Sequence, residues 1–249
     1  VHMSRGLGDV YKRQDEHYVA IDKPHGLLVH RNPKAPKAKT FALQQVRNMM
    51  RKKIYPIHRL DRATSGVLVF GLHSKAASRL QAYFRERSIQ KEYWAIVVGH
   101  TDDEGMIDLP LRKTANSPLK TSTTFYKTLA KVNMPAPVAL YPKNRYSLVS
   151  VYPKTGRMHQ IRRHFQHIKH PILGDKRYSN WHYNNWFFRE MDIKNMQLLS
   201  KKLTFIHPFS KEQICIEADI TTDMKTLFKN FQWQIPTHSV WKQENISLS

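Results

Sequence analysis

The sequence has few of the features that would indicate a disulfide-bonded, membrane-bound or nucleotide-dependent protein. A single cysteine, Cys215, excludes an internal disulfide and fits a reducing compartment, so a cytoplasmic protein is expected. Its alternation with Ile214 and Ile216 predicts a packed position in a strand. The longest apolar runs are far too short to span a bilayer, and no secretory hydrophobic segment begins the chain. A glycine-rich phosphate loop, a P-loop lysine and a Ser-His-Asp signature are also lacking, which argues against nucleotide-cofactor chemistry.

Acidic residues are scarce as well. Lys and Arg number 41 against 19 Asp and Glu, which gives a formal net charge of +22. Such an excess attracts polyanions, and nucleic acid is favoured over anionic membrane because no amphipathic helix has a clean basic face. Between Tyr152 and Tyr178 the only acid is Asp175, whereas the cations are Lys154, Arg157, Arg162, Arg163, Lys169, Lys176 and Arg177. This single-sign stretch, interleaved with aromatic residues, favours contact with an RNA or DNA backbone.

The spacing of apolar residues predicts an α+β fold. Strands are expected at 17–22, 66–72, 92–98, 121–126, 147–152, 203–207 and 213–218, the last two as a hairpin. Helices are expected at 40–53, after an N-cap at Ser74, after Thr155-Gly156, and at 221–231. The buried face of the third helix would carry Met158, Ile161, Phe165 and Ile168. Because strands and helices do not alternate regularly, we expect a mainly antiparallel sheet with flanking helices.

One domain is expected over residues 15–233. Residues 1–14 show neither helical nor strand periodicity and are interpreted as a tag or leader outside the fold. Residues 31–39 are expected to form a loop, 179–200 resist assignment, and 234–249 are expected to be a flexible tail.

The run HRLDRATSG, residues 58–66, contains the first candidate for chemistry. It places Asp61 between Arg59 and Arg62, whose charges would favour its ionised form and attract phosphate. An ionised carboxylate can attack carbon, take a proton or bind metal. The flanking arginines and the lack of a nearby second acid argue against metal, and the histidines at 159, 164, 167 and 170 lack the ligands that would complete a zinc site. A solvated loop acid with ordinary salt bridges is the simpler alternative.

Two further candidates are Arg162 and Tyr93. Arg162 follows the core-facing Ile161, so its side chain can reach into a cleft or lie along the helix flank with its head in water. Tyr93 begins a strand in which it shares a face with Ala95, while Trp94 faces the other side. Its ring could stack on a base and its hydroxyl could pass a proton. The alternative is a core tyrosine whose hydroxyl is satisfied internally.

Together these motifs resemble the pseudouridine synthases of the RluA type. The resemblance rests on five blocks in the same order, which are residues 22–30 (DKPHGLLVH), 58–66 (HRLDRATSG), 91–97 (KEYWAIV), 155–164 (TGRMHQIRRH) and 170–175 (HPILGD). It covers about residues 15–233 and implies the pseudouridine synthase fold, with a mixed, mainly antiparallel sheet and a catalytic cleft. It implies that Asp61 is the catalytic aspartate, Tyr93 the active-site tyrosine and Arg162 the arginine that pairs with the aspartate.

The resemblance also implies an activity, the isomerisation of a uridine to pseudouridine in RNA without metal or organic cofactor. The target base would be flipped out and Arg59 would enter the vacated stack. Further RNA contacts are expected from Arg62, Lys154, Arg157, His159, Arg163 and Lys176. Residues 134–135, 145–146 and 152–160 most resemble the members that modify uridine 65 of tRNA. An rRNA target and a non-catalytic RNA-binding protein are the alternatives, and a monomer is expected.

Overall fold

A computed structural model describes residues 11–31, 39–134 and 144–236. Its strands are β1 (Tyr11–Gln14), β2 (Tyr18–Lys23), β3 (Tyr55–Pro56), β4 (Ser65–Gly71), β5 (Gln90–Val98), β6 (Glu104–Asp108), β7 (Thr123–Asn133), β8 (Arg145–Pro153), β9 (Leu198–Ile206) and β10 (Gln213–Glu217). Its helices are α1 (Ala42–Met50), α2 (Ser74–Arg85), α3 (Gln160–His167), α4 (Trp181–Glu190) and α5 (Thr222–Asn230). In the described part of the chain, no helix has the length and apolar character needed to cross a membrane.

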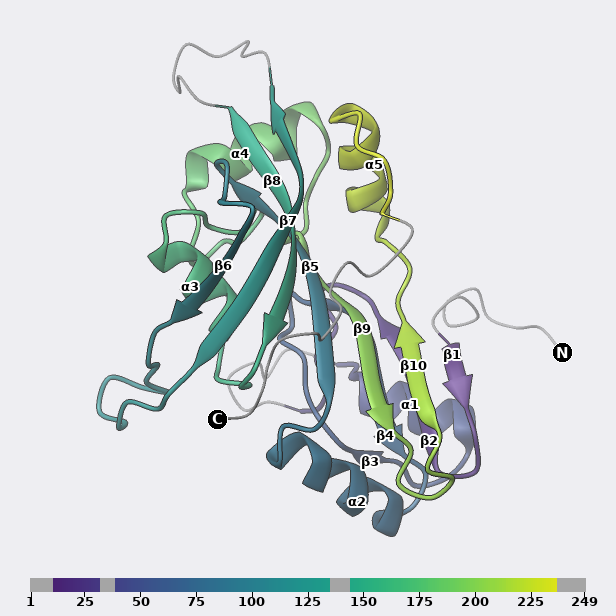
Figure 1. Cartoon of the computed structure of the whole chain (residues 1–249). Coiled ribbons are helices and arrows are strands. Elements are labelled where there is room, and N and C mark those ends of the chain that lie inside the picture. The colour runs from purple at the N-terminus through teal and green to yellow at the C-terminus, as the bar shows by residue number, and fades with distance from the viewer. Residues whose placement is uncertain (1–10, 32–38, 135–143, 237–249) are drawn as a thin grey trace, which may run out of the picture.

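The strands form one sheet that consists of two halves (Figure 1). The strand order is β1-β2-β4-β9-β5-β8-β7-β6, with β3 added to β4 and β10 to β9. The pairs are antiparallel except β4–β9, which is parallel and short, with Ser65 opposite Leu199 and Gly66 opposite Ser200. This junction joins the N-terminal strands to the rest of the sheet. The expected α+β fold with a mixed, mainly antiparallel sheet is confirmed.

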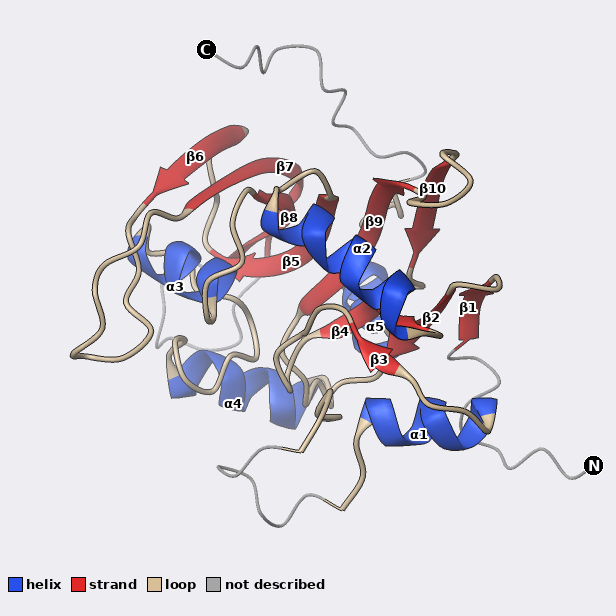
Figure 2. Ribbon diagram, turned by 90° about the horizontal axis from the view of Figure 1, so that it is seen from below, coloured by secondary structure: helices blue, strands red, loops and turns tan. Residues whose placement is uncertain are grey.

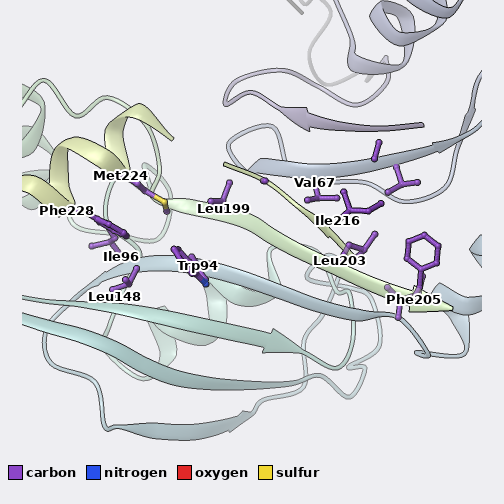
Figure 3. Close-up of a cluster of buried hydrophobic side chains, with 14 of the residues drawn as sticks. Val67, Trp94, Ile96, Leu148, Leu199, Leu203, Phe205, Ile216, Met224 and Phe228 are labelled. Carbon is purple, nitrogen blue, oxygen red and sulfur yellow. The ribbon is translucent and has the colours of Figure 1, made fainter. Parts of the chain in front are cut away.

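Helices lie on both faces of the sheet (Figure 2). On one face α1 covers β2 and β4, where Ala42 and Val46 pack against Leu68 and Phe70, and α3 covers β5 and β8. On the opposite face α5 packs on β5 and β8 through Met224 and Phe228, which lie near Trp94, Ile96 and Leu148 (Figure 3).

Gly66 allows the two halves to meet. Its φ of +105° lies in a region that side-chain-bearing residues rarely adopt, and an added Cβ would lie 2.3 Å from the carbonyl oxygen of Ser200. Any larger residue would therefore push β4 away from β9. The glycine at the end of the 58–66 motif is thus required by the strand junction that follows Asp61.

Several predictions made from the sequence need correction. Residues 11–14 form β1 and pair with β2, so they belong to the fold; residues 1–10 lie outside the described residues, as do 32–38 of the expected loop and 237–249 of the expected tail. Met158 precedes α3 and is 44% exposed, because the helix begins only at Gln160. Cys215 is exposed, since the buried face of β10 carries Ile214 and Ile216.

Other elements differ in their ends or were not assigned. The N-cap of α2 is His73, whose ring accepts a hydrogen bond from the Ala76 amide, in place of Ser74. The unassigned stretch 179–200 contains α4 and the start of β9. Strand β6 has no counterpart in the sequence prediction because its residues Glu104–Asp108 are mostly polar or exposed at a sheet edge.

Candidate active site

A cleft of about 930 Å³ opens beside the β4–β9 junction and contains Asp61. Asp61 starts a tight turn in which the Thr64 amide donates to the Asp61 carbonyl, directly before β4. Its side chain is 26% exposed, so it is neither solvated freely nor sealed in the core. Among the described residues that line the cleft, Asp61 is the sole carboxylate.

Cations surround this carboxylate. The lysines and arginines that line the cleft are Arg59, Arg85, Arg87, Lys91, Arg112, Lys113, Lys120, Lys154, Arg157 and Arg162. Most of them lie outside the basic stretch that the sequence singled out: before β4, on and just after α2, on β5, and on the connection between β6 and β7. An opening lined by one sign of charge concentrates anions near the enclosed carboxylate.

A buried lysine fixes the turn that carries Asp61. The Nζ of Lys23 donates to the carbonyls of Pro24 and Leu27, both at 2.8 Å, and to that of Arg62 at 3.3 Å. Burial lowers the pKa of Lys23 to about 7, although the charge of Asp61 opposes this shift. Arg62 Nε in turn donates to the Gly26 carbonyl at 2.9 Å. The Lys-Pro-His-Gly turn and the Asp61 turn are therefore joined into one unit.

Arg162 faces Asp61 but is held by a second aspartate. Its Nε and Nη2 donate to Asp175 at 2.7 and 2.9 Å, while Nη1 lies 3.4 Å from Oδ2 of Asp61. Burial opposes ionisation of Asp175, but its bonds to Arg162 outweigh this and lower its pKa. The expected pairing of Arg162 with Asp61 is present. The sequence hinted at the role of Asp175 in one way only, because it is the single acid in a basic stretch.

Tyr93 lies on the same face of β5 as the cleft, opposite Ser200 of β9 and Val151 of β8. Burial raises the pKa of Tyr93 to about 12, the hydrogen bond with Ser200 lowers it in part, and the charge of Asp61 raises it. At neutral pH the phenol therefore keeps its proton. The structure thus brings Asp61, Tyr93 and Arg162 into one cleft, as the sequence predicted.

The histidines of the motifs take different roles. His58 accepts a hydrogen bond from the Val69 amide at 3.0 Å and stacks on Phe84, and burial lowers its pKa to about 3. It is a neutral structural residue in the lining of the cleft. His159 enters the cleft, whereas His164 bonds to Ser122 and Leu109 elsewhere. Within the described ranges, no three His, Cys, Asp or Glu side chains gather in a way that could hold a metal ion.

The residues expected to contact RNA divide into two groups. Arg59, Lys154, Arg157 and His159 line the cleft. Arg62, Arg163 and Lys176 do not line it: Arg163 donates to the Arg112 carbonyl at 2.8 Å, and the Lys176 ammonium lies 5.5 Å from the centre of the Phe188 ring. Any RNA contact by this second group would lie outside the cleft.

Comparison with known proteins agrees with this geometry. Residues 17–167 match the family model described as RNA pseudouridylate synthase. A protein named tRNA pseudouridine synthase C from Vibrio parahaemolyticus is 39% identical over 88% of this chain and 94% of its own. Its namesakes from Haemophilus ducreyi and Pasteurella multocida are each 40% identical, over 90% and 89% of this chain and 96% of their own. The chain therefore belongs to the RNA pseudouridylate synthase family.

The protein is accordingly an RNA pseudouridine synthase, an isomerase that converts uridine to pseudouridine within RNA. The family resemblance noted in the sequence is confirmed. The solved structure titled Human RNA Pseudouridylate Synthase Domain Containing 4 has a TM-score of 0.72 at 22% identity, covering 93% of this chain and 96% of that one. Human RNA Pseudouridylate Synthase Domain Containing 1 has a TM-score of 0.66 at 20% identity. At these identities the two structures establish the shared fold.

Proposed function

We propose that this protein isomerises uridine 65 of tRNA, with Asp61 as the catalytic carboxylate. The observation that carries the proposal is the position of Asp61, which faces Arg162 at 3.4 Å and is the sole carboxylate among the described residues that line the cationic cleft. A tRNA is favoured over rRNA because the relatives that match nearly the full chain are named tRNA pseudouridine synthases. An rRNA target is the second candidate, on the ground that a catalytic core alone does not define the RNA that docks on it.

The reaction breaks the glycosidic C–N bond, turns the detached uracil and joins its C5 to the same ribose carbon. No atom is lost from the RNA apart from the C5 proton, which is replaced at nitrogen. Asp61 acts as nucleophile or as the anion that stabilises the developing sugar cation, or removes a ribose proton; all three roles need its charge. The cleft must hold the free base during the turn.

Arg162 and Tyr93 assist Asp61 in the reaction. Arg162 orients Asp61 through a charge-assisted contact. Tyr93 packs on the target base and, with a pKa raised to about 12 by burial, offers a proton-bearing hydroxyl at neutral pH. Its hydroxyl is suited to relaying the proton that leaves C5.

The surrounding cations bind the RNA itself. Flipping a uridine out of a helix costs roughly a few kcal/mol, which phosphate contacts must offset. Arg59 is exposed at the cleft and its planar group suits the space that the base leaves. Lys154 and Arg157 also line the cleft and follow β8 in the chain.

The proposal is tested by incubating the protein with unmodified tRNA and, separately, rRNA transcripts, and mapping pseudouridine with a selective adduct. We expect modification of tRNA at position 65, lost when that uridine is replaced by cytidine. Modification of rRNA alone would overturn the tRNA assignment. Mapping RNA from cells with and without the protein gives the same contrast in vivo.

A further inference from the structure

Two side chains reach the same oxygen of Asp61. Arg162 Nη1 lies 3.4 Å from Oδ2, and His159 Nε2 lies 3.8 Å from that same atom. Neither of these contacts uses Oδ1. A carboxylate can turn about its Cβ–Cγ bond and exchange its oxygens, so two neighbours on one oxygen limit this rotation.

His159 is itself held in place. Its Nδ1 lies 2.9 Å from the hydroxyl of Tyr178, and the two rings meet edge to face at 5.6 Å. His159 has a φ of +54° at the N-cap of α3, and its side chain lines the cleft. Both the histidine and its partner are partly buried.

The Asp61 carboxylate and the Tyr178 hydroxyl together favour one tautomer of His159. If the phenol donates to Nδ1, the ring proton lies on Nε2 and faces the Asp61 carboxylate. The other neutral tautomer would turn a lone pair toward the same anion and be repelled. Burial lowers the pKa of His159, opposed by Asp61 and helped by Arg162 and Arg177, so the neutral form prevails at neutral pH.

One loop organises both neighbours of Asp61. Asp175 binds the guanidinium of Arg162, and the amides of Arg177 and Tyr178 donate to Oδ1 of Asp175 at 2.9 and 3.1 Å. The Tyr178 ring also lies 5.0 Å from the Arg162 guanidinium carbon. Residues 175–178 therefore fix the orientation of Arg162 and of His159 together.

We infer that His159, oriented by Tyr178, is a positioning residue that holds Oδ2 of Asp61 with Arg162 and leaves Oδ1 for the nucleotide. This rests on the proposed catalytic role of Asp61 and replaces the RNA contact expected for His159. In the reactive complex, the Nε2–H of His159 needs to approach by less than an ångström to complete a hydrogen bond to the carboxylate.

Single-turnover rates and RNA affinity, measured separately on the same tRNA transcript, test this role. In His159→Ala the rate falls about tenfold, as expected for a lost hydrogen bond to a charged group, while the dissociation constant for RNA stays within about twofold. His159→Gln recovers part of the rate, since its amide can place a donor near Oδ2. Ala and Gln share the left-handed backbone cost at this position, so their difference isolates the side chain.

Tyr178→Phe supplies an independent check. It keeps the ring beneath Arg162 but removes the hydroxyl, and we expect a smaller fall in rate with unchanged RNA affinity. Unchanged rates in His159→Ala, a change confined to affinity, or Gln no better than Ala would each overturn the inference. If the wild-type protein forms no pseudouridine, the proposed function fails instead, which separates the two.

Discussion

Arg162 binds both oxygens of Asp175 but contacts Asp61 through one nitrogen. Nε and Nη2 lie 2.7 and 2.9 Å from Asp175, and Nη1 lies 3.4 Å from Asp61. Asp175 is 1% exposed, so its charge is satisfied by this guanidinium and by backbone amides. Asp175 fixes the plane of the guanidinium, which then presents its remaining edge to the cleft.

The Arg162→Lys variant should therefore lose activity, although it keeps the positive charge. An ammonium cannot bind Asp175 at two points and reach Asp61 at the same time. We expect turnover to fall at least about tenfold, and the free energy of unfolding to fall by about 2 kcal/mol because a buried pair is weakened. Steady-state assays and denaturant melts measure both. Arg163→Lys is the matched control, and equal activity of the two variants would contradict the role of Arg162.

Removal of the Tyr93 hydroxyl separates packing from proton transfer. Tyr93→Phe keeps the ring on β5 and should leave RNA affinity unchanged, while a relay role predicts a fall of about 100-fold in the single-turnover rate. Tyr126→Phe, a buried tyrosine of β7, serves as control. A rate near that of the wild type would assign Tyr93 to packing alone.

The buried Lys23 predicts a pH dependence of stability. Burial lowers its folded-state pKa to about 7, against about 10.5 in the unfolded chain, so between these values the unfolded state binds more protons. The free energy of unfolding should therefore gain about 2 kcal/mol from this group between pH 7 and pH 9. Lys23→Met should lose this rise, whereas Lys225→Met on α5 should keep it. Parallel pH profiles for Lys23→Met and the wild type would refute the assignment.

The cationic cleft predicts a strong salt dependence of RNA binding. Each phosphate contact adds about 0.7 to 0.9 to the slope of log affinity against log salt concentration. Lys154→Gln should lower the magnitude of that slope by about 0.7 to 0.9, the contribution of one phosphate contact. Lys229→Gln, at the end of α5, should not change it. Fluorescence-anisotropy titrations at several salt concentrations provide the slopes. An unchanged slope for Lys154→Gln would exclude it from the phosphate contacts.

Much of the fold follows from periodicity. The buried strands and amphipathic helices, such as β4 and α5, contain the residues that the sequence predicted. Short elements with few apolar residues were missed, because β1 and β6 gain their stability from pairing with longer neighbours. Local propensity carries no information about such long-range pairing.

The site was predicted less completely. Asp61, Tyr93 and Arg162 were found through their motifs. Lys23 lies in one of the matching blocks but was given no role, because it ends an apolar strand like any solvated lysine. The flanking Arg59 and Arg62 were expected to hold Asp61 ionised. In the structure the guanidinium facing Asp61 belongs to Arg162, about a hundred residues later in the chain, and Arg62 turns to the Gly26 carbonyl. Such long-range pairs depend on how the sheet halves meet.

The most direct measurement is the single-turnover rate of Asp61→Asn on a tRNA transcript, with RNA affinity determined alongside. The amide keeps the shape of the side chain and removes its charge, so binding should persist while no pseudouridine forms at position 65. Substantial residual turnover would contradict the central claim that the Asp61 carboxylate performs the chemistry.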